Sequence, residues 1–447
     1  MKLRKLLRVV NINQEMINHK VKGIYNNSKE CTKDSVFFAI KGSVSDGYDY
    51  IDDAINNGAR TIFTDRDIDR DVNIIKVKDI KRIFAIVVNA YHKYPTKKIP
   101  VIGVTGTNGK TSTSMLIHNF LKKKGSLLIG TNGVYFNDEK TETLNTTPDI
   151  LTVIRYINKA RKKRLKYVVM EVSSIGICEY RVHGFEFEQV IYTNLTADHL
   201  DYHKTINNYI HAKKKLLLQT KRHNVLNKDD EVLYSFRNFK SVFYDLSDVS
   251  VVNEVPLEFV YKGETFKTNL YGEFNLYNIM AMITSLQLLG CKLKRLKKSI
   301  SNFSIEGRMD VLNIGDKKII IDFAHTTSAV ENVLKTFKGV AVIGCGGDRD
   351  RTKRKDISKV CVDNAEFTIF TLDNPRTENI KTIFDDMTNG LSGEFIIIED
   401  RFKAIEYAIK NYDTVLILGK GHEEYQIIGN KKYPFSDYEA VNKILKE

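Results

Sequence analysis

Residues 103–111 read Gly-Val-Thr-Gly-Thr-Asn-Gly-Lys-Thr, which combines the residue types that bind the phosphates of a nucleotide. Gly106 and Gly109 allow backbone N–H groups to turn toward phosphate oxygens. The helix expected directly after them adds favourable partial charge. Lys110 would neutralise the β- and γ-phosphates, and the Thr111 hydroxyl would bind Mg²⁺. The segment predicts a phosphate-binding loop, which kinases, hydrolases and ligases all use.

The elements on either side of this loop would hold it in place. We expect a buried strand at Val101–Thr105 before the loop and an amphipathic helix at 111–124 after it. Val104 stands where the strict pattern has its first glycine, so Gly103 and Gly106 would form the turn. Strand, loop and helix in this order favour a nucleotide-phosphate site over a chance glycine turn.

The rest of the chain alternates strand-like apolar runs with helix-length segments, which is typical of parallel sheets with crossover helices. Two helices are expected at 50–58 and 80–94. Residues 95–100 have the composition of a linker, and a second break falls near Gly307. The other expected strands are 36–40, 61–64, 73–77, 167–172, 189–194, 318–323, 340–344, 367–371, 395–398 and 414–418.

The composition is that of a folded protein with a basic surface. With 447 residues, 42% of them hydrophobic, the chain is long enough for roughly two to four packed domains. The formal net charge of +14 comes mainly from lysines spread along the chain, and no stretch interleaves aromatic and basic residues to stack bases. We therefore expect a solvated basic surface and phosphate-bearing substrates, and no nucleic acid.

Targeting signals and cysteine usage favour a cytoplasmic protein. The N-terminal residues lack the apolar core and cleavage site of a signal peptide, and no uncharged apolar run is long enough to insert in a membrane. Five dispersed cysteines, with no Cys-x-x-Cys pair, indicate free thiols in a reducing compartment.

A series of motifs along nearly the whole chain resembles the Mur ligase family. Any one of them could be accidental, but their occurrence together and in this order could not plausibly be. The motifs are TGTNGKT (105–111), NTTPD (145–149), EVSS (171–174), TNLTADHLDYH (193–203), AKKKL (212–216), GEFNLYN (272–278), GRMD (307–310), GCGGDRD (344–350), DNPR (373–376) and GKGHE (419–423).

The resemblance implies a three-domain α/β architecture and an ATP-dependent acid–amino-acid ligase. Residues 1–97 would bind the UDP part of a substrate, and 98–308 would form a central P-loop-type ATPase domain with a parallel sheet. Residues 309–447 would form a Rossmann-like domain that binds the amino acid and closes over the nucleotide. The resemblance also implies a monomer whose partners are a UDP-activated muramoyl peptide and a diamino acid.

Activating a carboxylate as an acyl phosphate brings two anions together, so cations must bridge them. Glu171, at the end of an expected strand, would hold Mg²⁺ beside Thr111. By resemblance, His199 and Lys213 form a second metal position, and CO₂ carbamylates Lys213 to make it an anionic ligand. The implied catalytic residues are Lys110, Glu171, His199 and Lys213. The implied ATP-binding residues are Gly106, Thr107, Asn108, Gly109, Lys110, Thr111, Ser112, Asn275, Arg308, Asp322 and His325.

The resemblance also assigns two groups of substrate-binding residues. Arg376 offers a bidentate fork for a distal carboxylate such as that of meso-diaminopimelate, and Glu423 would meet the distal ammonium. The muramoyl peptide would contact Ser28, Thr146, Thr147, Ser173 and Arg181. The amino acid would contact Arg349, Asp373, Asn374, Arg376, Gly419 and Glu423.

The expected reaction adds meso-diaminopimelate to UDP-N-acetylmuramoyl-L-Ala-D-Glu in peptidoglycan synthesis. Ile175 replaces a usual His, Glu179 replaces a usual Gln near an anionic substrate, and Thr327-Ser328 replaces Pro-Asp. These departures favour an alternative, a Mur-type ligase diverted to another acid and amine, or the same step with lanthionine or L-lysine. Retention of Lys110, Glu171 and the rest of the catalytic set disfavours a third reading, a non-catalytic nucleotide-binding protein.

Overall fold

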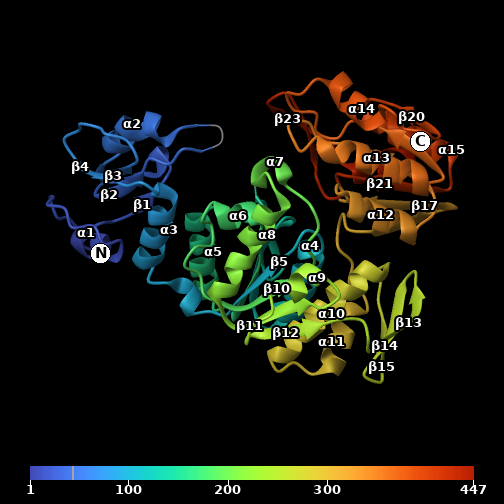
Figure 1. Cartoon of the computed structure of the whole chain (residues 1–447), viewed down its shortest axis with the longest axis horizontal. Coiled ribbons are helices and arrows are strands. Elements are labelled where there is room, and N and C mark those ends of the chain that lie inside the picture. The colour runs from blue at the N-terminus through green and yellow to red at the C-terminus, as the bar shows by residue number, and fades with distance from the viewer. Residues whose placement is uncertain (43–44, 144, 447) are drawn as a thin grey trace.

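The computed structural model describes residues 1–42, 45–143 and 145–446. Three α/β domains, each with its own mainly parallel sheet, follow one another along the long axis of the molecule (Figure 1). Within the described residues, no helix combines the length and apolar character that crossing a bilayer requires. All five cysteines are free thiols, as predicted.

The N-terminal domain is a four-stranded parallel sheet of order β1-β2-β3-β4. Phe38 of β2 stacks on Phe63 of β3 with ring centroids 4.2 Å apart, and Phe84 of α3 packs against the pair. The elements are α1 (Leu3–Val9), β1 (Ile24–Tyr25), η1 (Ser28–Glu30), β2 (Ser35–Phe38), η2 (Gly47–Tyr50), α2 (Ile51–Asn56), β3 (Ala59–Thr64), β4 (Asn73–Lys76) and α3 (Ile80–Tyr91). The expected linker contains a 3₁₀ turn, η3 (Pro95–Lys97).

The central domain has an eight-stranded sheet of order β12-β11-β10-β5-β9-β6-β7-β8, of which the first six strands are parallel. Its strands are β5 (Val101–Thr105), β6 (Ser126–Gly130), β7 (Gly133–Phe136), β8 (Glu139–Thr141), β9 (Tyr167–Glu171), β10 (Phe187–Tyr192), β11 (Thr220–Asn227) and β12 (Ser241–Tyr244). The expected strand at Val101–Thr105 is confirmed, and those at 167–172 and 189–194 are confirmed with ends shifted by one or two residues.

Helices cover both faces of this sheet: α4 and α10 pack on one face and α5 on the other. The helices are α4 (Lys110–Leu121), η4 (Lys122–Lys124), α5 (Ile150–Lys162), α6 (Ser174–Cys178), α7 (Leu200–His203), α8 (Ile206–Lys214), η5 (Lys215–Gln219), α9 (Glu231–Tyr234), α10 (Glu273–Leu288) and α11 (Leu293–Ile300). A small antiparallel sheet, absent from the sequence prediction, consists of β13 (Val249–Glu254), β14 (Leu257–Tyr261) and β15 (Glu264–Lys267).

The C-terminal domain is a six-stranded sheet of order β16-β17-β21-β18-β19-β20, parallel except for β16. One face is covered by α12, α13 and α14 and the other by α15 and α16, so the inner strands β17, β21, β18 and β19 are largely apolar. The elements are β16 (Asp310–Ile314), β17 (Lys317–Asp322), α12 (Thr327–Thr336), β18 (Val340–Ile343), α13 (Thr352–Asn364), β19 (Phe367–Phe370), α14 (Ile380–Thr388), β20 (Phe395–Ile397), α15 (Arg401–Asn411), β21 (Thr414–Leu418), β22 (Tyr425–Ile428), β23 (Lys431–Pro434) and α16 (Asp437–Ile444).

Candidate functional site

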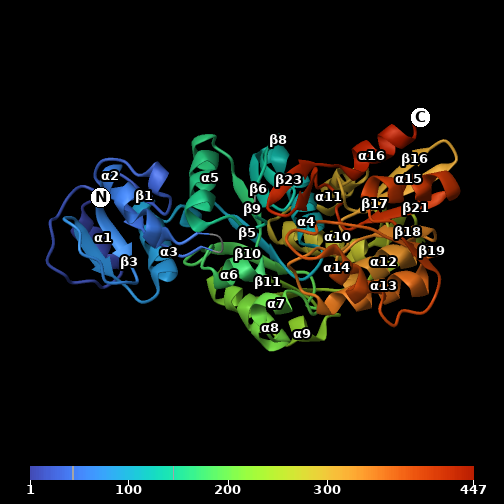
Figure 2. The ribbon, with the colours of Figure 1, turned by 90° about the horizontal axis from the view of Figure 1, so that it is seen from above.

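A cavity of about 960 Å³ lies between the central and C-terminal domains. Its central-domain wall includes loops that follow β5, β6, β9 and β10 and residues of α8 and α10. Its opposite wall includes loops that follow β17, β18, β19 and β21 and residues of α12. Ligands of open α/β sheets bind at the carboxyl ends of the strands, and here two such edges face one another (Figures 1 and 2). The fold therefore brings most of the predicted site residues into one cavity.

The phosphate-binding loop lies between β5 and α4, as predicted. Gly109 has a φ of +80°, and a Cβ there would lie 2.3 Å from Oδ1 of Asn278 on α10, so only glycine fits. The Lys110 ammonium folds back over the loop and donates to the carbonyl oxygens of Gly106 (3.0 Å) and Thr107 (2.7 Å). Burial lowers the pKa of Lys110. These contacts hold the lysine where the phosphates of a nucleotide would replace the carbonyls as partners.

Glu171, the last residue of β9, is buried at the head of α4. Its Oε2 accepts hydrogen bonds from Thr111 Oγ1 (3.1 Å) and Thr131 Oγ1 (2.9 Å), and its Oε1 accepts one from the Thr131 backbone N–H (2.9 Å). Thr131 follows β6, the strand next to β9. Thr131 was not predicted as a site residue, because no strand was expected at β6 (Ser126–Gly130), whose carboxyl end places it here.

The oxygen donors at this point have the chemistry that Mg²⁺ prefers. Thr111 supplies a hydroxyl and Glu171 a carboxylate, both beside the phosphate-binding loop. Within the described ranges, no group of three or more histidine, cysteine, aspartate or glutamate side chains is placed to hold a metal ion by itself. The residues fit a Mg²⁺ ion whose remaining ligands are substrate oxygens and water.

Lys213 lies at the end of α8 and is 1% exposed. Its Nζ donates to Gly106 O (2.8 Å) and Thr105 Oγ1 (3.3 Å), so Lys110 and Lys213 share one carbonyl acceptor. Burial, and then the nearby Lys110 ammonium, lower the pKa of Lys213 well below its usual value. In the part of the chain that the structure describes, Lys213 forms no ion pair with a carboxylate. Its surroundings therefore disfavour the ammonium form.

His199 directly precedes α7, has a φ of +54° and lines the same cavity. Its Nε2 lies 3.5 Å from Oδ2 of Asp198, a buried carboxylate that the sequence analysis left without a role. Burial lowers the pKa of His199 despite this neighbour.

Residues near β16 and β17, together with Asn275 of α10, close the end of the cavity beside the phosphate-binding loop. Asp322 accepts hydrogen bonds from the backbone N–H groups of Met309 (2.6 Å) and Ala324 (2.7 Å). Arg308 donates to Thr111 Oγ1 (3.2 Å), but its buried Nε has no partner within the described residues. A buried donor without a partner at a cavity wall is expected to bind a ligand. His325 and Asn275 also line this end.

The segment Thr326–Ser328 departs from the family motif at Thr327 and Ser328, but it still joins the C-terminal domain to the central domain. Asn108 of the phosphate-binding loop donates through Nδ2 to Ser328 Oγ (3.1 Å), and its Oδ1 accepts from Thr326 Oγ1 (3.3 Å). Thr326 also accepts from the Ala329 N–H at the start of α12. The departure at Thr327 and Ser328 therefore leaves the contact between C-terminal domain and loop intact.

Three of the expected peptide-binding residues form one cluster. The Thr147 carbonyl accepts from Arg181 Nη1 (2.8 Å), and the Thr147 hydroxyl donates to the Glu171 carbonyl (3.0 Å) and accepts from the Ser173 N–H (3.0 Å). Thr146, one residue earlier, contacts Thr131 Oγ1 at 3.0 Å. Thr146 and Ser173 line the cavity, and Thr147 supports them from behind.

Ser28 is not brought to this cavity. It lies in η1 of the N-terminal domain, where the Asn27 side chain accepts from the Lys29 N–H as an aspartate would. A second cavity of about 390 Å³ in the same region is lined by Lys41, Gly42, Asp65 and Lys78–Lys81.

The residues expected to bind the amino acid meet at the C-terminal wall. Arg376 has a φ of +52° and is held by its N–H bond to Ile427 O (3.0 Å) and by Nη1 bonds to Gly347 O (2.8 Å) and Asn374 O (3.3 Å). Burial, and then the nearby Arg349, lower its pKa. Glu423 accepts from Asn374 Nδ2 (3.0 Å) and Lys420 Nζ (3.1 Å). Asp373 and Gly419 complete this wall.

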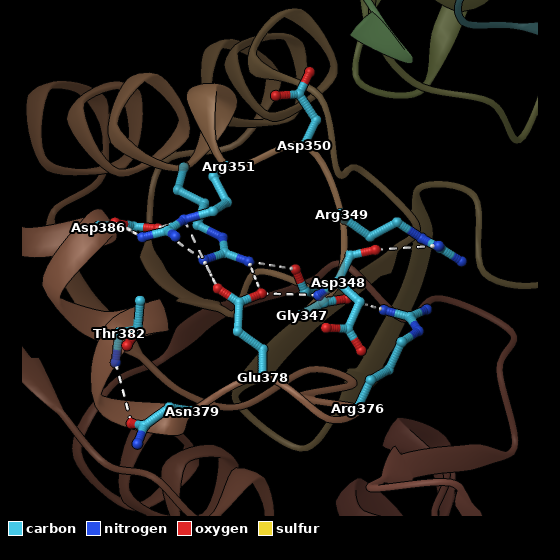
Figure 3. A network of polar contacts seen from close by, with 12 residues as sticks. Gly347, Asp348, Arg349, Asp350, Arg351, Arg376, Glu378, Asn379, Thr382 and Asp386 are labelled. Carbon is cyan, nitrogen blue, oxygen red and sulfur yellow. Dashed lines mark hydrogen bonds and ion pairs between the residues drawn. The ribbon is translucent and has the colours of Figure 1, made fainter. Parts of the chain in front are cut away.

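A network that the sequence analysis missed holds the two loops behind Arg376 together (Figure 3). Arg354 of α13 is 1% exposed, and its Nη1 and Nη2 each lie 2.7 Å from a carboxylate oxygen of Glu378. Arg354 also bonds Asp386 (2.8 Å) and Gly346 O (3.1 Å). Glu378 Oε2 in turn accepts from the Asp348 N–H (2.8 Å). The pair thus joins the 344–350 loop to the 373–379 loop.

Glu179, the departure that put a negative charge near an anionic substrate, is already neutralised. It forms an ion pair with Lys81 of α3 in the N-terminal domain and accepts from Tyr202 OH (2.8 Å). Burial alone would raise the pKa of Glu179, but the hydrogen bonds from Lys81 and Tyr202 outweigh burial and lower it. Beside this pair, Tyr180 OH donates to Asp79 Oδ2 (2.8 Å). Glu179 therefore links two domains.

The order of the three domains matches that of a known protein family. Three family profiles match in series: the Mur ligase family catalytic domain at 20–103, the Mur ligase middle domain at 104–286 and the Mur ligase glutamate ligase domain at 307–421. The chain is 37% identical to the UDP-N-acetylmuramoyl-L-alanyl-D-glutamate--2,6-diaminopimelate ligase of Fusobacterium nucleatum subsp. nucleatum, over 98% of this chain and 96% of that protein.

The chain belongs to the Mur ligase family. This Mur ligase is also 35% identical to the ligase of the same name from Oceanobacillus iheyensis, over 100% of this chain and 99% of that protein. A solved structure of such a 2,6-diaminopimelate ligase superposes with a TM-score of 0.67 at 27% identity, over 99% of this chain and 98% of that one. The ADP complex of MurF from Thermotoga maritima shares the fold at 19% identity, with a TM-score of 0.63 and coverage of 95% and 97%. The three-domain architecture expected of this Mur ligase is confirmed.

Proposed function

We propose that this Mur ligase is a UDP-N-acetylmuramoyl-tripeptide synthetase that adds meso-diaminopimelate to UDP-N-acetylmuramoyl-L-Ala-D-Glu. One observation carries the proposal: a single cavity has the phosphate-binding loop at one end and Arg376 with Arg349 at the other. Two guanidiniums at the amino-acid end suit a substrate with a second carboxylate, which L-lysine lacks. The names of the full-length relatives agree with this assignment.

The reaction has two balanced steps. The acceptor carboxylate attacks the γ-phosphorus of ATP, which forms an acyl phosphate and releases ADP. The amine then attacks the acyl carbon, and the tetrahedral adduct loses phosphate and a proton to leave the amide. Lys110 binds the β- and γ-phosphates, and Arg308 and Asp322 hold the nucleotide against the loop.

Two Mg²⁺ positions are proposed beside the phosphate-binding loop. Thr111 and Glu171 would hold one Mg²⁺, and His199 with carbamylated Lys213 would hold a second. Bound Mg²⁺ would offset the negative charge of the reacting phosphate and carboxylate. The carbamate forms when the neutral Lys213 amine takes up CO₂ and loses a proton, which its burial favours.

The substrates would span all three domains. Ser28 would bind the UDP part in the N-terminal domain, with Lys41 and Lys78 near its diphosphate. Thr146, Ser173 and Arg181 would carry the muramoyl peptide toward Lys110, with Thr147 behind them. Asp373, Asn374 and Gly419 would position the amino acid, with its distal carboxylate on Arg376 and its distal ammonium on Glu423. Gly106, Thr107, Asn108, Gly109, Ser112, Asn275 and His325 would complete the nucleotide site.

We further propose domain limits of 1–97, 98–308 and 309–447, and a monomer that acts in the cytoplasm, where ATP and nucleotide-activated precursors are supplied. The limits place the η3 turn and Arg308 at the junctions.

Phosphate release from ATP tests the assignment. Purified protein with Mg²⁺ and UDP-N-acetylmuramoyl-L-Ala-D-Glu is expected to turn over with meso-diaminopimelate and not with L-lysine or without an amine. A lanthionine reaction tests whether another diamino diacid is accepted. Turnover with L-lysine alone would contradict the role of Arg376. ATP binding without turnover for any amine would support the alternative, a Mur-type ligase that uses another acid and amine. The negative charge of Glu179 was one argument for that alternative, and the Lys81–Glu179 ion pair weakens it.

The Lys81–Glu179 pair yields a prediction about the N-terminal domain. Lys81→Glu leaves two carboxylates facing one another, so KM for the UDP-linked substrate is expected to rise about tenfold while KM for ATP stays unchanged. The double variant Lys81→Glu/Glu179→Lys restores an ion pair and should recover most of the loss. Steady-state kinetics of the three proteins measure this, and a double variant no better than Lys81→Glu would contradict the role of the pair.

Glu378→Gln tests the network behind Arg376. The buried Arg354 loses its bidentate carboxylate, so the Arg376 loop should shift and KM for meso-diaminopimelate should rise about tenfold, with KM for ATP unchanged. Asp363→Asn, which breaks an exposed ion pair with Lys359 on the same helix, is the matched control. Equal kinetics for both variants would show that the network does not position Arg376.

A further inference from the structure

The six parallel strands of the central sheet all begin at one edge, opposite the edge that holds the cavity. The segments 97–100, 122–125, 161–166, 218–222 and 237–240 lead into five of these strands, and none contains an aspartate or glutamate. We call these five segments the basic edge. Its exposed cations are Lys97, Lys98, Lys123, Lys124, Arg161, Lys162, Lys163, Arg164, Lys166, Lys221, Arg222 and Arg237.

Backbone and side-chain contacts join these distant segments. The Lys166 N–H donates to Gly125 O (2.8 Å), and Lys240 Nζ donates to Thr220 O (2.5 Å). The basic helix α11 extends the same surface, because Asn119 at the end of α4 donates to Ser299 O (2.9 Å). Figure 1 shows α11, β11 and β12 on the lower side of the central domain, with α7, α12 and α13 above.

Few carboxylates neutralise this surface. Glu186 and Glu188, at the start of β10, pair with Lys221 (3.3 Å) and Arg222 (2.7 Å), and Glu139 pairs with Lys163 (2.5 Å). Asp138 pairs with the half-buried Lys122 (2.9 Å), and Glu264 pairs with Lys297 of α11 (3.3 Å). The other exposed cations of the basic edge have no carboxylate partner within the described residues. A concentration of like charge on one face raises the local potential and attracts polyanionic surfaces.

Two apolar side chains stand out from the same edge. Phe239 is 94% exposed and Leu218 is 90% exposed, the highest values among the large hydrophobic side chains that the structure describes. Phe239 lies between Arg237 and Lys240, whose Nζ is 5.5 Å from the ring centroid. The Lys240–Thr220 bond places the Phe239 segment beside the Leu218 segment. Exposed apolar groups ringed by cations are typical of peripheral contact with a membrane.

We propose that the basic edge docks onto a bilayer surface that contains anionic phospholipids, with Phe239 and Leu218 entering the headgroup region. A nucleic acid would use the same cations, but Leu218 offers no ring for base stacking and lysines outnumber arginines in these segments. The cavity opens at the opposite edge of the sheet, so substrates reach it while the protein is docked. The proposal does not depend on which amine the enzyme uses.

Sedimentation with lipid vesicles tests the proposal on the full chain. Vesicles of phosphatidylcholine with about one-third phosphatidylglycerol are expected to bind the protein, and pure phosphatidylcholine is not. Binding should weaken at least about tenfold when salt is raised from about 0.05 M to about 0.3 M. Phe239→Ser/Leu218→Ser should lower affinity about tenfold at fixed salt. Ile17→Ser, at an exposed apolar position in the N-terminal domain, should change nothing.

Two double variants with the same change in net charge complete the test. Lys123→Glu/Lys166→Glu should lower vesicle affinity at least about tenfold, whereas Lys5→Glu/Lys33→Glu changes the net charge equally and should lower it less than about threefold. Unchanged ligase activity of all variants without vesicles shows that they fold. No binding to anionic vesicles would overturn the proposal. So would binding that duplex DNA displaces and that the Phe239 and Leu218 changes leave intact, because that result indicates a nucleic-acid surface.

Discussion

Arg376→Ala is expected to lower kcat/KM for meso-diaminopimelate by about 10²- to 10³-fold, because a half-buried guanidinium that pairs with the distal carboxylate is lost. Arg376→Lys keeps the charge but not the planar fork, so it should recover only part of the loss. The left-handed backbone at Arg376 is held by main-chain bonds to Ile427 and Gly429, which both variants retain. The loss is therefore expected in KM for the amino acid, with KM for ATP unchanged.

Steady-state kinetics with varied meso-diaminopimelate and fixed ATP measure this effect. Lys359→Ala is the control, since Lys359 is an exposed cation of the C-terminal domain that pairs with Asp363 outside the cavity. Wild-type kinetics for Arg376→Ala would show that another group binds the distal carboxylate. A gain of activity with L-lysine in Arg376→Ala would support the role of Arg376 in selecting the amine.

Lys213→Ala is expected to lower kcat about 10³-fold, because the site loses the anionic carbamate that would complete the second metal position. Lys213 donates only to neutral oxygens of Thr105 and Gly106, and Lys110 is close by. A buried amine in these surroundings is available for reaction with CO₂, whereas a protonated one is not. Nucleotide binding through Lys110 should change less than about threefold.

Carbon-13 NMR supplies a readout that is independent of activity. Wild-type protein equilibrated with ¹³C-bicarbonate is expected to show one carbamate carbon signal, and Lys213→Ala is expected to lack it. Lys214→Ala, at the exposed neighbouring lysine, should keep both the signal and the activity. A fully active wild-type enzyme without a carbamate signal would show that Lys213 acts as an unmodified side chain.

The separation of Ser28 from the main cavity has a physical consequence for binding. Arg181 contacts Thr147 beside that cavity, while Ser28 lies in another domain. A substrate that reaches both must cross the junction at Lys81 and Glu179, so movement of the N-terminal domain is expected to change KM for the UDP-linked substrate first. Kinetics of the charge-exchange variants address this junction directly.

Local sequence determined the phosphate-binding loop and the strand that precedes it. Val101–Thr105 is a buried apolar run, and Gly109 with Lys110 directly follows a turn, so short-range patterning was enough to place both. The expected helix after the loop ends at Leu121 and continues as a 3₁₀ turn, because helix ends depend on local hydrogen bonding that apolar periodicity does not encode. The small β13–β15 sheet was also missed, because β13 is mostly exposed and β15 has only four residues, so the alternating burial of β14 stood alone.

Tertiary structure alone decided which charges meet. The sequence separates Lys81 from Glu179, Lys110 from Lys213 and Arg354 from Glu378, and no pattern of spacing shows that each pair is adjacent. These contacts arise because the carboxyl ends of parallel strands, and the helices between them, converge at common edges of the sheets. Motifs thus identified the residue types for ligase chemistry, whereas domain packing set the burial and the neighbours that determine how each one behaves.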